Sequence, residues 1–340
     1  EYELGEGQIK LYNNQVFVAD NIKEIIPEFL MLLKGTIDCA DLPLNVSRNF
    51  LQKDSNVIKL SKHITRKVSD KLSELFENER EKYEGFWKDI SPFIKYGSVK
   101  DKSFYEKVKD VLIFKSINGN YITLKEYFDK TGGKKENKDE NKIFYANNEK
   151  QQSQYIKLFQ DQGIEAVILD SAIDNHFISY IEMYEGDISF YRIDSDLSED
   201  LKGDKSEDKE KDEEIVEAIK KALDIEKLDI KLENLKTEEP QAVLLMSEHE
   251  RRMQEMSNLF GGEDTAHLFK GEETLILNKN NSLVNTLYKI ANDKEKQEDF
   301  KLICKHIYDL SLMGSRGLEA DKLEEFLKRS GKILERLANL

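Results

Sequence analysis

The sequence predicts a mixed α/β protein of two or three compact units whose chain ends in a helical hairpin. Its 340 residues are too many for one ordinary core, and 39% of them are hydrophobic, which is enough to fill several. A strand, a helix and a second apolar strand follow one another in residues 142–170, and two amphipathic helices close the chain. We therefore expect an α/β and α+β fold. A first domain of α/β layers joined by a helical hairpin precedes a smaller α+β domain, whose terminal hairpin dimerises as a four-helix bundle.

The first expected elements are a hairpin of strands, a short helix and a hairpin of helices. Apolar and polar residues alternate on both sides of Asn13 and Asn14, which is typical of a β-hairpin. Pro27 suits the first turn of a helix and Gly35 suits the left-handed position after one, so a short helix is expected between them. From residue 55, apolar residues recur at spacings of three and four. This pattern predicts two packed helices over 55–97.

The clearest unit is a strand, a helix and a second strand in the middle of the chain. The segment KIFYA predicts a strand, the residues up to Gly163 predict a helix, and IEAVILD predicts a buried strand. Such a unit is right-handed and pairs its strands in parallel. A further helix and strand lead to the charged segment 194–214, which has no aromatic residue and is either a linker or the solvated start of a helix. The predicted domains are 1–205, with parts 1–54, 55–97 and 98–205, and 206–340.

The last two helices carry a wide apolar stripe on either side of the turn MGSRGLEA. A hairpin of two helices cannot hide such a stripe by itself. A second copy of the chain would complete a four-helix bundle, and we therefore expect a homodimer. The residues expected in the dimer interface are Ile307, Leu310, Phe326, Leu327, Leu334 and Leu337.

Composition excludes several classes of protein. The 52 basic and 67 acidic residues leave a net charge of −15, which would repel a phosphate backbone, so no nucleic-acid partner is expected. No apolar run approaches the ~20 residues that span a bilayer, and we expect no membrane partner. Cys39 and Cys304 lie far apart, outside any metal-binding spacing, as expected in a reducing compartment. We expect a cytoplasmic protein. Because the chain opens at Glu1 on strand-like sequence, we expect a piece of a longer protein.

No complete catalytic site is visible in the sequence. The patterns GxxxxGK[ST], GxGxxG, HExxH and GxSxG do not occur, and the five histidines are scattered. We therefore expect the chain by itself to be no enzyme and to hold no metal or cofactor.

Three segments carry a resemblance to a known family. At LYNNQVFVADN, PEFLMLLKG and above all DLPLNVSRNFLQ, the sequence resembles the middle domain of the ninety-kilodalton heat-shock chaperones, of the bacterial HtpG type. The likeness continues through FIKYGSVKD and IFYANNEKQQ to the terminal LMGSRGLEADKLEEFLKRSGKILERLA, and so covers essentially the whole chain. It implies the middle and carboxy-terminal dimerisation domains of such a chaperone, without the amino-terminal domain that binds ATP and magnesium.

The resemblance implies a role for the loop DLPLNVSRNFLQ. In the family, the loop's arginine reaches into the ATP site of the amino-terminal domain and contacts the γ-phosphate, and a glutamine four residues later assists. These positions are Arg48 and Gln52. A guanidinium supplied from another domain stabilises the charge that spreads over phosphate oxygens during transfer. The alternative is that Arg48 pairs with a nearby acid.

The resemblance also implies two sites for unfolded or partly folded client proteins. The first is the segment DNHFISY, where Asn175 and His176 stand in place of the acid and aromatic residue that relatives often carry. The second is RRMQEMSNLFGG, whose apolar residues fall at spacings of three and four and include flexible methionines that suit varied partners. The alternative for this stripe is an ordinary core. Its residues are Met253, Met256, Leu259 and Phe260.

Two classes of function remain open from the sequence. In the first, the chain is the middle and dimerisation part of a chaperone whose intact form is an ATPase, and its partners are clients, the amino-terminal ATPase domain and a second copy. In the second, it is a binding module that holds apolar client segments with no role for nucleotide.

Overall fold

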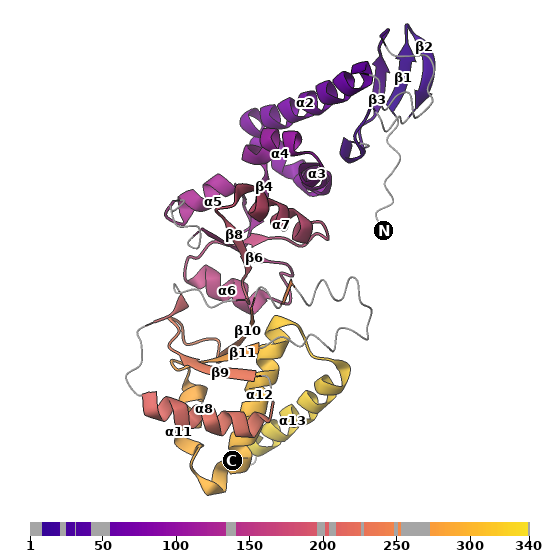
Figure 1. The fold of residues 1–340 in the computed structure, drawn as a ribbon. Coiled ribbons are helices and arrows are strands. Elements are labelled where there is room, and N and C mark those ends of the chain that lie inside the picture. Colours follow the sequence, from indigo (N-terminus) through magenta and orange to yellow (C-terminus); the bar gives the residue numbers. More distant parts are fainter. Residues whose placement is uncertain are drawn as a thin grey trace. The chain divides into compact units, whose positions relative to one another are not determined.

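The computed structural model describes residues 9–20, 25–30, 32–41, 55–133, 141–195, 201–203, 209–225, 228–247, 251–252 and 273–338 (Figure 1). The chain forms two compact units. The first comprises Glu1–Phe114, Tyr121–Lys134 and Ser171–Asp187, and the second comprises Lys115–Asn120, Lys135–Asp170 and Ile188–Leu340. The expected boundary between residues 205 and 206 falls inside the second unit, and that division into domains stays a prediction.

The first unit begins with a three-stranded sheet of order β2-β1-β3. Strand β1 is antiparallel to β2 and parallel to β3. Asn14 and Gln15 both have positive φ, at 50° and 66°, which is the conformation of a two-residue type I′ hairpin turn. The predicted hairpin is confirmed, with its turn one residue later than expected. The strands are β1 (Ile9–Asn13), β2 (Val16–Asp20) and β3 (Gly35–Asp38).

The helix expected between Pro27 and Gly35 is reduced to a single 3₁₀ turn, η1 (Glu28–Leu30). Gly35 pairs with Ile9 at the start of the parallel β1–β3 ladder, so the chain must extend before it reaches that residue. The short helix expected here is therefore shorter in the described residues than the sequence predicts. Phe29 anchors the turn instead, because its buried ring packs 4.8 Å from the ring of Phe104.

The predicted helical hairpin is confirmed as α2 (Ser55–Asn78) and α3 (Arg80–Lys100), which break at Glu79. Tyr83 and Trp87 of α3 are buried with ring centroids 5.5 Å apart. The hydroxyl of Tyr83 donates a hydrogen bond of 2.8 Å to the carbonyl of Val111. The other helices of this unit are α4 (Lys102–Val108), α5 (Leu124–Lys130) and α7 (Asp174–Glu185), with the short turn η2 (Lys109–Val111).

A five-stranded sheet has the order β5-β4-β7-β6-β8. Strand β6 pairs in parallel with both β7 and β8, which confirms the predicted parallel unit. Its helix α6 (Ser153–Asp161) starts later than expected, because the side chain of Gln152 accepts hydrogen bonds from the backbone of Asn147 and Asn148 and holds a turn there. The strands are β4 (Ile113–Ser116), β5 (Tyr121–Thr123), β6 (Lys142–Ala146), β7 (Val167–Ile168) and β8 (Ser189–Arg192).

The second unit also contains a small sheet, of order β10-β11-β9, with helices packed against it. Helix α12 contacts both β10 and α8, and its apolar side chains complete a core with the strands. The mixed α/β fold class is confirmed. The elements are α8 (Lys209–Leu223), β9 (Leu228–Glu233), β10 (Ala242–Met246), β11 (Glu273–Asn278), α11 (Ser282–Ile290), η5 (Lys294–Lys296), α12 (Gln297–Ser315) and α13 (Ala320–Ala338).

Candidate functional site

The strongest candidate for a functional surface is the hairpin of α12 and α13 (Figure 1). Helix α12 ends where Gly317 takes a positive φ of 86°, and the amide of Gly317 donates a 2.9 Å hydrogen bond to the carbonyl of Leu312. A left-handed glycine at this position ends a helix and lets the chain turn back. The second helix can therefore return along the first.

Polar and aromatic contacts join the two helices. The ring of His306 stacks on Phe326 with centroids 4.9 Å apart and planes 6° from parallel. The guanidinium of Arg329 donates a hydrogen bond to the carboxylate of Asp309, and the two side chains form an ion pair. Burial lowers the pKa of His306, and the neighbouring Arg329 lowers it further. Burial also raises the pKa of Asp309, against the opposing effect of Arg329.

The outer face of α13 is apolar and open. None of the side chains from Ala320 to Ala338 is buried, although four leucines lie along one face of the helix. Several exposed leucines on one face of a helix are typical of an interaction surface. The exposed fractions are 39% for Leu323, 60% for Leu327, 65% for Leu334 and 61% for Leu337.

The residues expected at a dimer interface divide into three groups. Ile307 is only 2% exposed and belongs to the core that α12 forms with the sheet, so its own chain already covers it. Leu310 and Phe326 are half-buried, and Phe326 faces His306. Leu327, Leu334 and Leu337 lie exposed on α13, where a second chain could reach them.

Helix α7 carries the expected client residues Asn175 and His176, and both are exposed. The start of the helix is fixed by the buried Asp174, which pairs with Lys95 of α3 and accepts a 3.0 Å hydrogen bond from the amide of Ser171. Met183 lies seven residues after His176, on the same face, and is 76% exposed. We did not expect this residue from the sequence. Its spacing of two helical turns from His176 was the signal that could have found it.

Six expected site residues lie outside the described residues. They are Arg48, Gln52, Met253, Met256, Leu259 and Phe260.

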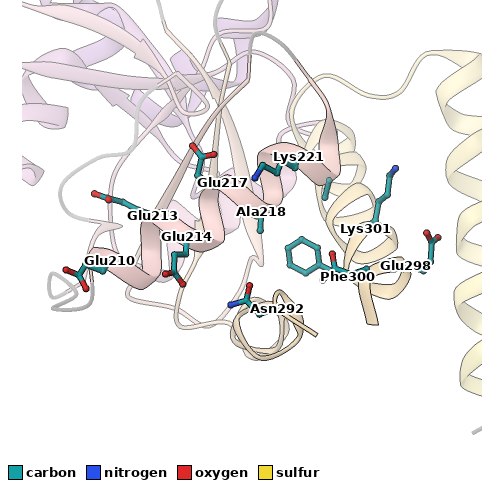
Figure 2. Close-up of a pocket in the computed structure, with 12 residues that line it drawn as sticks. Glu210, Glu213, Glu214, Glu217, Ala218, Lys221, Asn292, Glu298, Phe300 and Lys301 are labelled. Carbon is teal, nitrogen blue, oxygen red and sulfur yellow. The ribbon is translucent and has the colours of Figure 1, made fainter. Parts of the chain in front are cut away.

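The second unit also carries an acidic groove of about 920 Å³ between α8 and the start of α12 (Figure 2). Four glutamates of α8 line it, together with Phe300 of α12. Figure 2 shows the carboxylates of Glu213 and Glu217 pointing away from that of Glu214, so they do not converge on one point. Among the described residues, no group of three histidine, cysteine or acidic side chains could hold a metal ion.

The comparisons with known proteins agree with the resemblance seen in the sequence. A family model described as Hsp90 protein matches residues 2–340. The chain belongs to the Hsp90 family. A curated relative from Bacteroides fragilis (strain YCH46), named chaperone protein htpG, is 36% identical over 304 residues, which are 87% of this chain and 44% of the relative. The HtpG chaperone of Bacteroides thetaiotaomicron is 36% identical over 83% of the chain and 43% of its own length.

A third relative gives the longest of these alignments. The HtpG chaperone of Buchnera aphidicola is 28% identical over 96% of this chain and 52% of its own length. The chain thus spans about half the length of the Hsp90 relatives it matches. No helix in the described part of the chain is long and apolar enough to cross a bilayer.

Proposed function

We propose that this chain is the middle and carboxy-terminal part of a cytoplasmic molecular chaperone that uses ATP. The chain dimerises and binds client proteins. It also supplies an arginine side chain to the ATP site of a preceding domain. The observation that carries this proposal is the Hsp90 family match across residues 2–340, together with relatives named as HtpG chaperones that are about twice as long.

The catalytic contribution of the chain is Arg48, assisted by Gln52. Nucleotide and magnesium bind in the preceding domain that the Hsp90 family match implies. The guanidinium of Arg48 meets the γ-phosphate with two donors and stabilises the negative charge of the transferring group. By itself the chain does not hydrolyse ATP.

Client proteins bind at two surfaces. One is the exposed face of α7, with Asn175, His176 and Met183. The other is the segment with Met253, Met256, Leu259 and Phe260, whose flexible methionines adapt to different apolar partners. Both surfaces suit a chaperone that recognises exposed apolar sequence and no particular ligand shape.

The homodimer forms through α12 and α13. Burial of the four exposed leucines by a second copy removes a patch that a soluble monomer rarely leaves open. Two copies bring four client surfaces and two ATP-site arginines into one molecule.

The test of the ATP role is Arg48→Ala in the intact protein. We expect turnover to fall with nucleotide affinity nearly unchanged, since other contacts hold the nucleotide. The loss approaches the roughly 10³–10⁵-fold typical of such arginines, and is smaller where slow domain closure limits the rate. Arg48→Lys restores little, because an ammonium lacks the two-pronged geometry. Arg66→Ala, an exposed arginine of α2, is the matched control.

Single-turnover hydrolysis measures the effect. If Arg48→Ala turns over ATP like the unaltered protein, the arginine is an ordinary surface charge. The chain is then better described as a module that holds clients without nucleotide.

The client role is tested with Met256→Ser combined with Phe260→Ser. Affinity for a labelled unfolded client, followed by fluorescence anisotropy, should fall while the melting temperature stays unchanged. Ile58→Ser is the matched control, since Ile58 is an exposed apolar residue of α2, outside the proposed client surfaces and the α12–α13 hairpin. A drop in melting temperature with unaltered client affinity would mean that the stripe belongs to a core.

A further inference from the structure

Helix α2 forms one wall of an apolar groove in the first unit. Two cavities, of about 140 Å³ and about 390 Å³, lie along the helix and share Leu33, Val68 and Leu72 as wall residues. We call the two cavities together the α2 groove. The described residues that line the smaller cavity are all apolar, and they include the buried Phe29 and Phe104. An apolar cavity of ~150 Å³ holds a benzene-sized group, so the smaller cavity can take one phenylalanine or leucine side chain.

Apolar side chains at the edge of the α2 groove are partly open. Leu32 and Leu33, which follow η1, are 40% and 37% exposed. On α2, Ile64, Val68 and Leu72 follow one another at steps of four residues and are half-buried. Residues four apart are neighbours on a helix surface. These three side chains therefore form a continuous apolar row, about 12 Å long at ~1.5 Å per residue.

A row of basic side chains runs beside this apolar row. His63, Lys67 and Lys71 each precede a member of the apolar row by one residue, and they line the larger cavity with exposed side chains. Lys71 pairs with Glu74 at 2.7 Å, but the two side chains are 56% and 57% exposed. Pairs of such exposure contribute little to stability and exchange readily for other partners. The two lysines can therefore meet the carboxylates of another molecule.

The charge of this part of α2 is opposite to that of the chain as a whole, which carries a net charge of −15. An acidic segment of another protein is therefore repelled by the chain as a whole and attracted to α2. Charge complementarity of this kind selects a partner and speeds the encounter with it. The basic residues of α2 between 55 and 72 are Lys59, Lys62, Arg66, Lys67 and Lys71, and the one acid there is Asp70.

We propose that the α2 groove binds an acidic amphipathic helix of a partner protein. One leucine or phenylalanine of that helix enters the smaller cavity, and its other apolar residues pack along the row from Ile64 to Leu72. Its aspartates and glutamates lie opposite Lys67 and Lys71. Apolar anchors at helical spacing are the usual means by which a groove holds a helix. This surface is separate from the two client surfaces proposed above and does not depend on the ATP role.

A small anionic amphiphile, such as a fatty acid, is the other ligand that suits an apolar cavity with a lysine at its edge. The length of the basic row favours the helix. His63, Lys67 and Lys71 extend over about 12 Å, or two helical turns, beside an apolar row of equal length. One carboxylate needs one lysine, whereas a helix with several carboxylates uses the whole row.

Fluorescence anisotropy with a labelled synthetic peptide tests the proposal on the unaltered chain. The peptide is a short helix with leucines and glutamates in adjacent rows at spacings of four. Its controls carry lysines in place of the glutamates, or serines in place of the leucines. At low salt we expect the acidic peptide to bind at least about tenfold more tightly than either control, a difference of ~1.4 kcal/mol. Its advantage over the lysine peptide should shrink at high salt. Equal binding of the acidic and basic peptides, or no binding of the acidic one, would contradict the inference.

Charge-reversed variants locate the peptide on the chain. Lys67→Glu with Lys71→Glu should weaken binding of the acidic peptide by at least about tenfold, because attraction becomes repulsion at both positions. Lys62→Glu with Arg66→Glu is the matched control, with the same spacing on the same helix at positions that do not line the groove, and should weaken binding by less than about threefold. All four side chains are exposed, so the fold tolerates either change. An equal loss in the two variants would mean that the peptide is attracted to α2 in general, and the groove would not be its site.

A serine variant tests the apolar part of the groove. Leu33→Ser should weaken the acidic peptide by at least about fivefold, whereas Ile58→Ser, at a 44% exposed position of α2 that does not line the groove, should leave the affinity unchanged. Equal affinities in these two variants would overturn the inference.

Two further measurements identify a different occupant. If decanoate binds with the dependence on Lys67 and Lys71 expected of the peptide, and the peptide does not displace it, the ligand is a small amphiphile and the helix is wrong. If Lys67→Glu with Lys71→Glu changes the mass in sedimentation equilibrium, a second copy of the chain fills the groove and the acidic partner is wrong. We expect neither result.

Discussion

The chain contains two helical hairpins with similar sequence patterns and opposite surroundings. Helix α3 packs against α2, α4, α7 and η1, and it buries Tyr83, Trp87 and Ile94. Helix α13 packs against α12 and buries none of its side chains. Both helices are amphipathic, so the sequence pattern alone does not show which other residues bury the apolar face of each helix. The difference shows that one hairpin is completed within the chain, whereas the other has an apolar face that is still open.

The largest expected effect is the loss of the dimer when the open face of α13 is made charged. Leu327→Glu with Leu334→Glu should halve the mass measured by sedimentation equilibrium at micromolar concentration. A buried leucine contributes about 1.5–3 kcal/mol, so the four side chains altered per dimer should raise the dissociation constant by more than about 10³-fold. The folded monomer should remain, because these positions are exposed in the single chain.

The counterpart of this change in the closed hairpin is Trp87→Ala. It should lower the free energy of unfolding by about 3–5 kcal/mol, because it leaves a cavity among residues that the chain itself packs. The mass should not change. If Trp87→Ala dissociated the dimer, or if the glutamate variant unfolded the monomer, the contrast between the two hairpins would be wrong.

An effect of similar size is expected at the ion pair that holds α3, and a smaller one at the ion pair between α12 and α13. Lys95 of α3 pairs with Asp174 of α7, and their side chains are 7% and 3% exposed. Asp174→Asn leaves the lysine buried without its counter-charge and should lower the free energy of unfolding by about 3–5 kcal/mol. Asp309→Asn breaks the pair with Arg329 at a less buried site, where burial already disfavours the carboxylate, and should cost about 1 kcal/mol.

Urea unfolding followed by circular dichroism measures both variants. An equal loss at the two sites would mean that the α12–α13 hairpin is held as rigidly as α3. Lys95→Met combined with Asp174→Leu is a useful control, because replacing both partners with apolar side chains removes the uncompensated charge.

Much of the secondary structure can be predicted from the spacing of apolar residues, because it depends on residues that are close together in the sequence. The strand KIFYA, the hairpin 55–97 and the terminal helices appear where the sequence predicts them. The segment after Pro27 differs, because pairing of Gly35 with β1 overrides the capping signals. The late start of α6 depends on the side chain of Gln152, which accepts hydrogen bonds from the amides of Asn147 and Asn148 and holds a turn before the helix. The point at which these helices and strands begin thus depends on contacts that form only when the chain folds.

The candidate site was predictable in part. Spacing placed the leucines of α13 on one face, but could not show that Ile307 turns into the core while Leu327 stays open, since both belong to the same stripe. The sequence did not indicate Met183, because its neighbours in sequence are polar or buried. Met183 and His176 lie on the same face only once α7 has formed. The roles of Arg48 and Gln52 come from the family resemblance, and these residues lie outside the described part of the chain.

The smallest expected effect concerns His306, which makes the folding stability of the α12–α13 hairpin depend on pH. Its ring stacks on Phe326 of α13 and faces Arg329 across the helix pair, with Asp309 nearby. Burial and Arg329 lower the pKa of His306 below its usual value of about 6.5. The unfolded chain therefore binds a proton more readily than the folded chain, and stability falls as the pH drops from above 6.5 toward the lowered pKa.

His306→Phe should remove this dependence while keeping a ring on Phe326. We expect the melting temperature of the unaltered chain to fall more between pH 7.5 and 5.5 than that of the variant. His176→Phe, at the exposed histidine of α7, is the matched control and should behave like the unaltered chain. Asp309 acts in the opposite direction, because burial raises its pKa above about 3.8 and folding then favours the protonated acid. A melting temperature that rises in the unaltered chain over this range would mean that Asp309, and not His306, governs how firmly α13 is held.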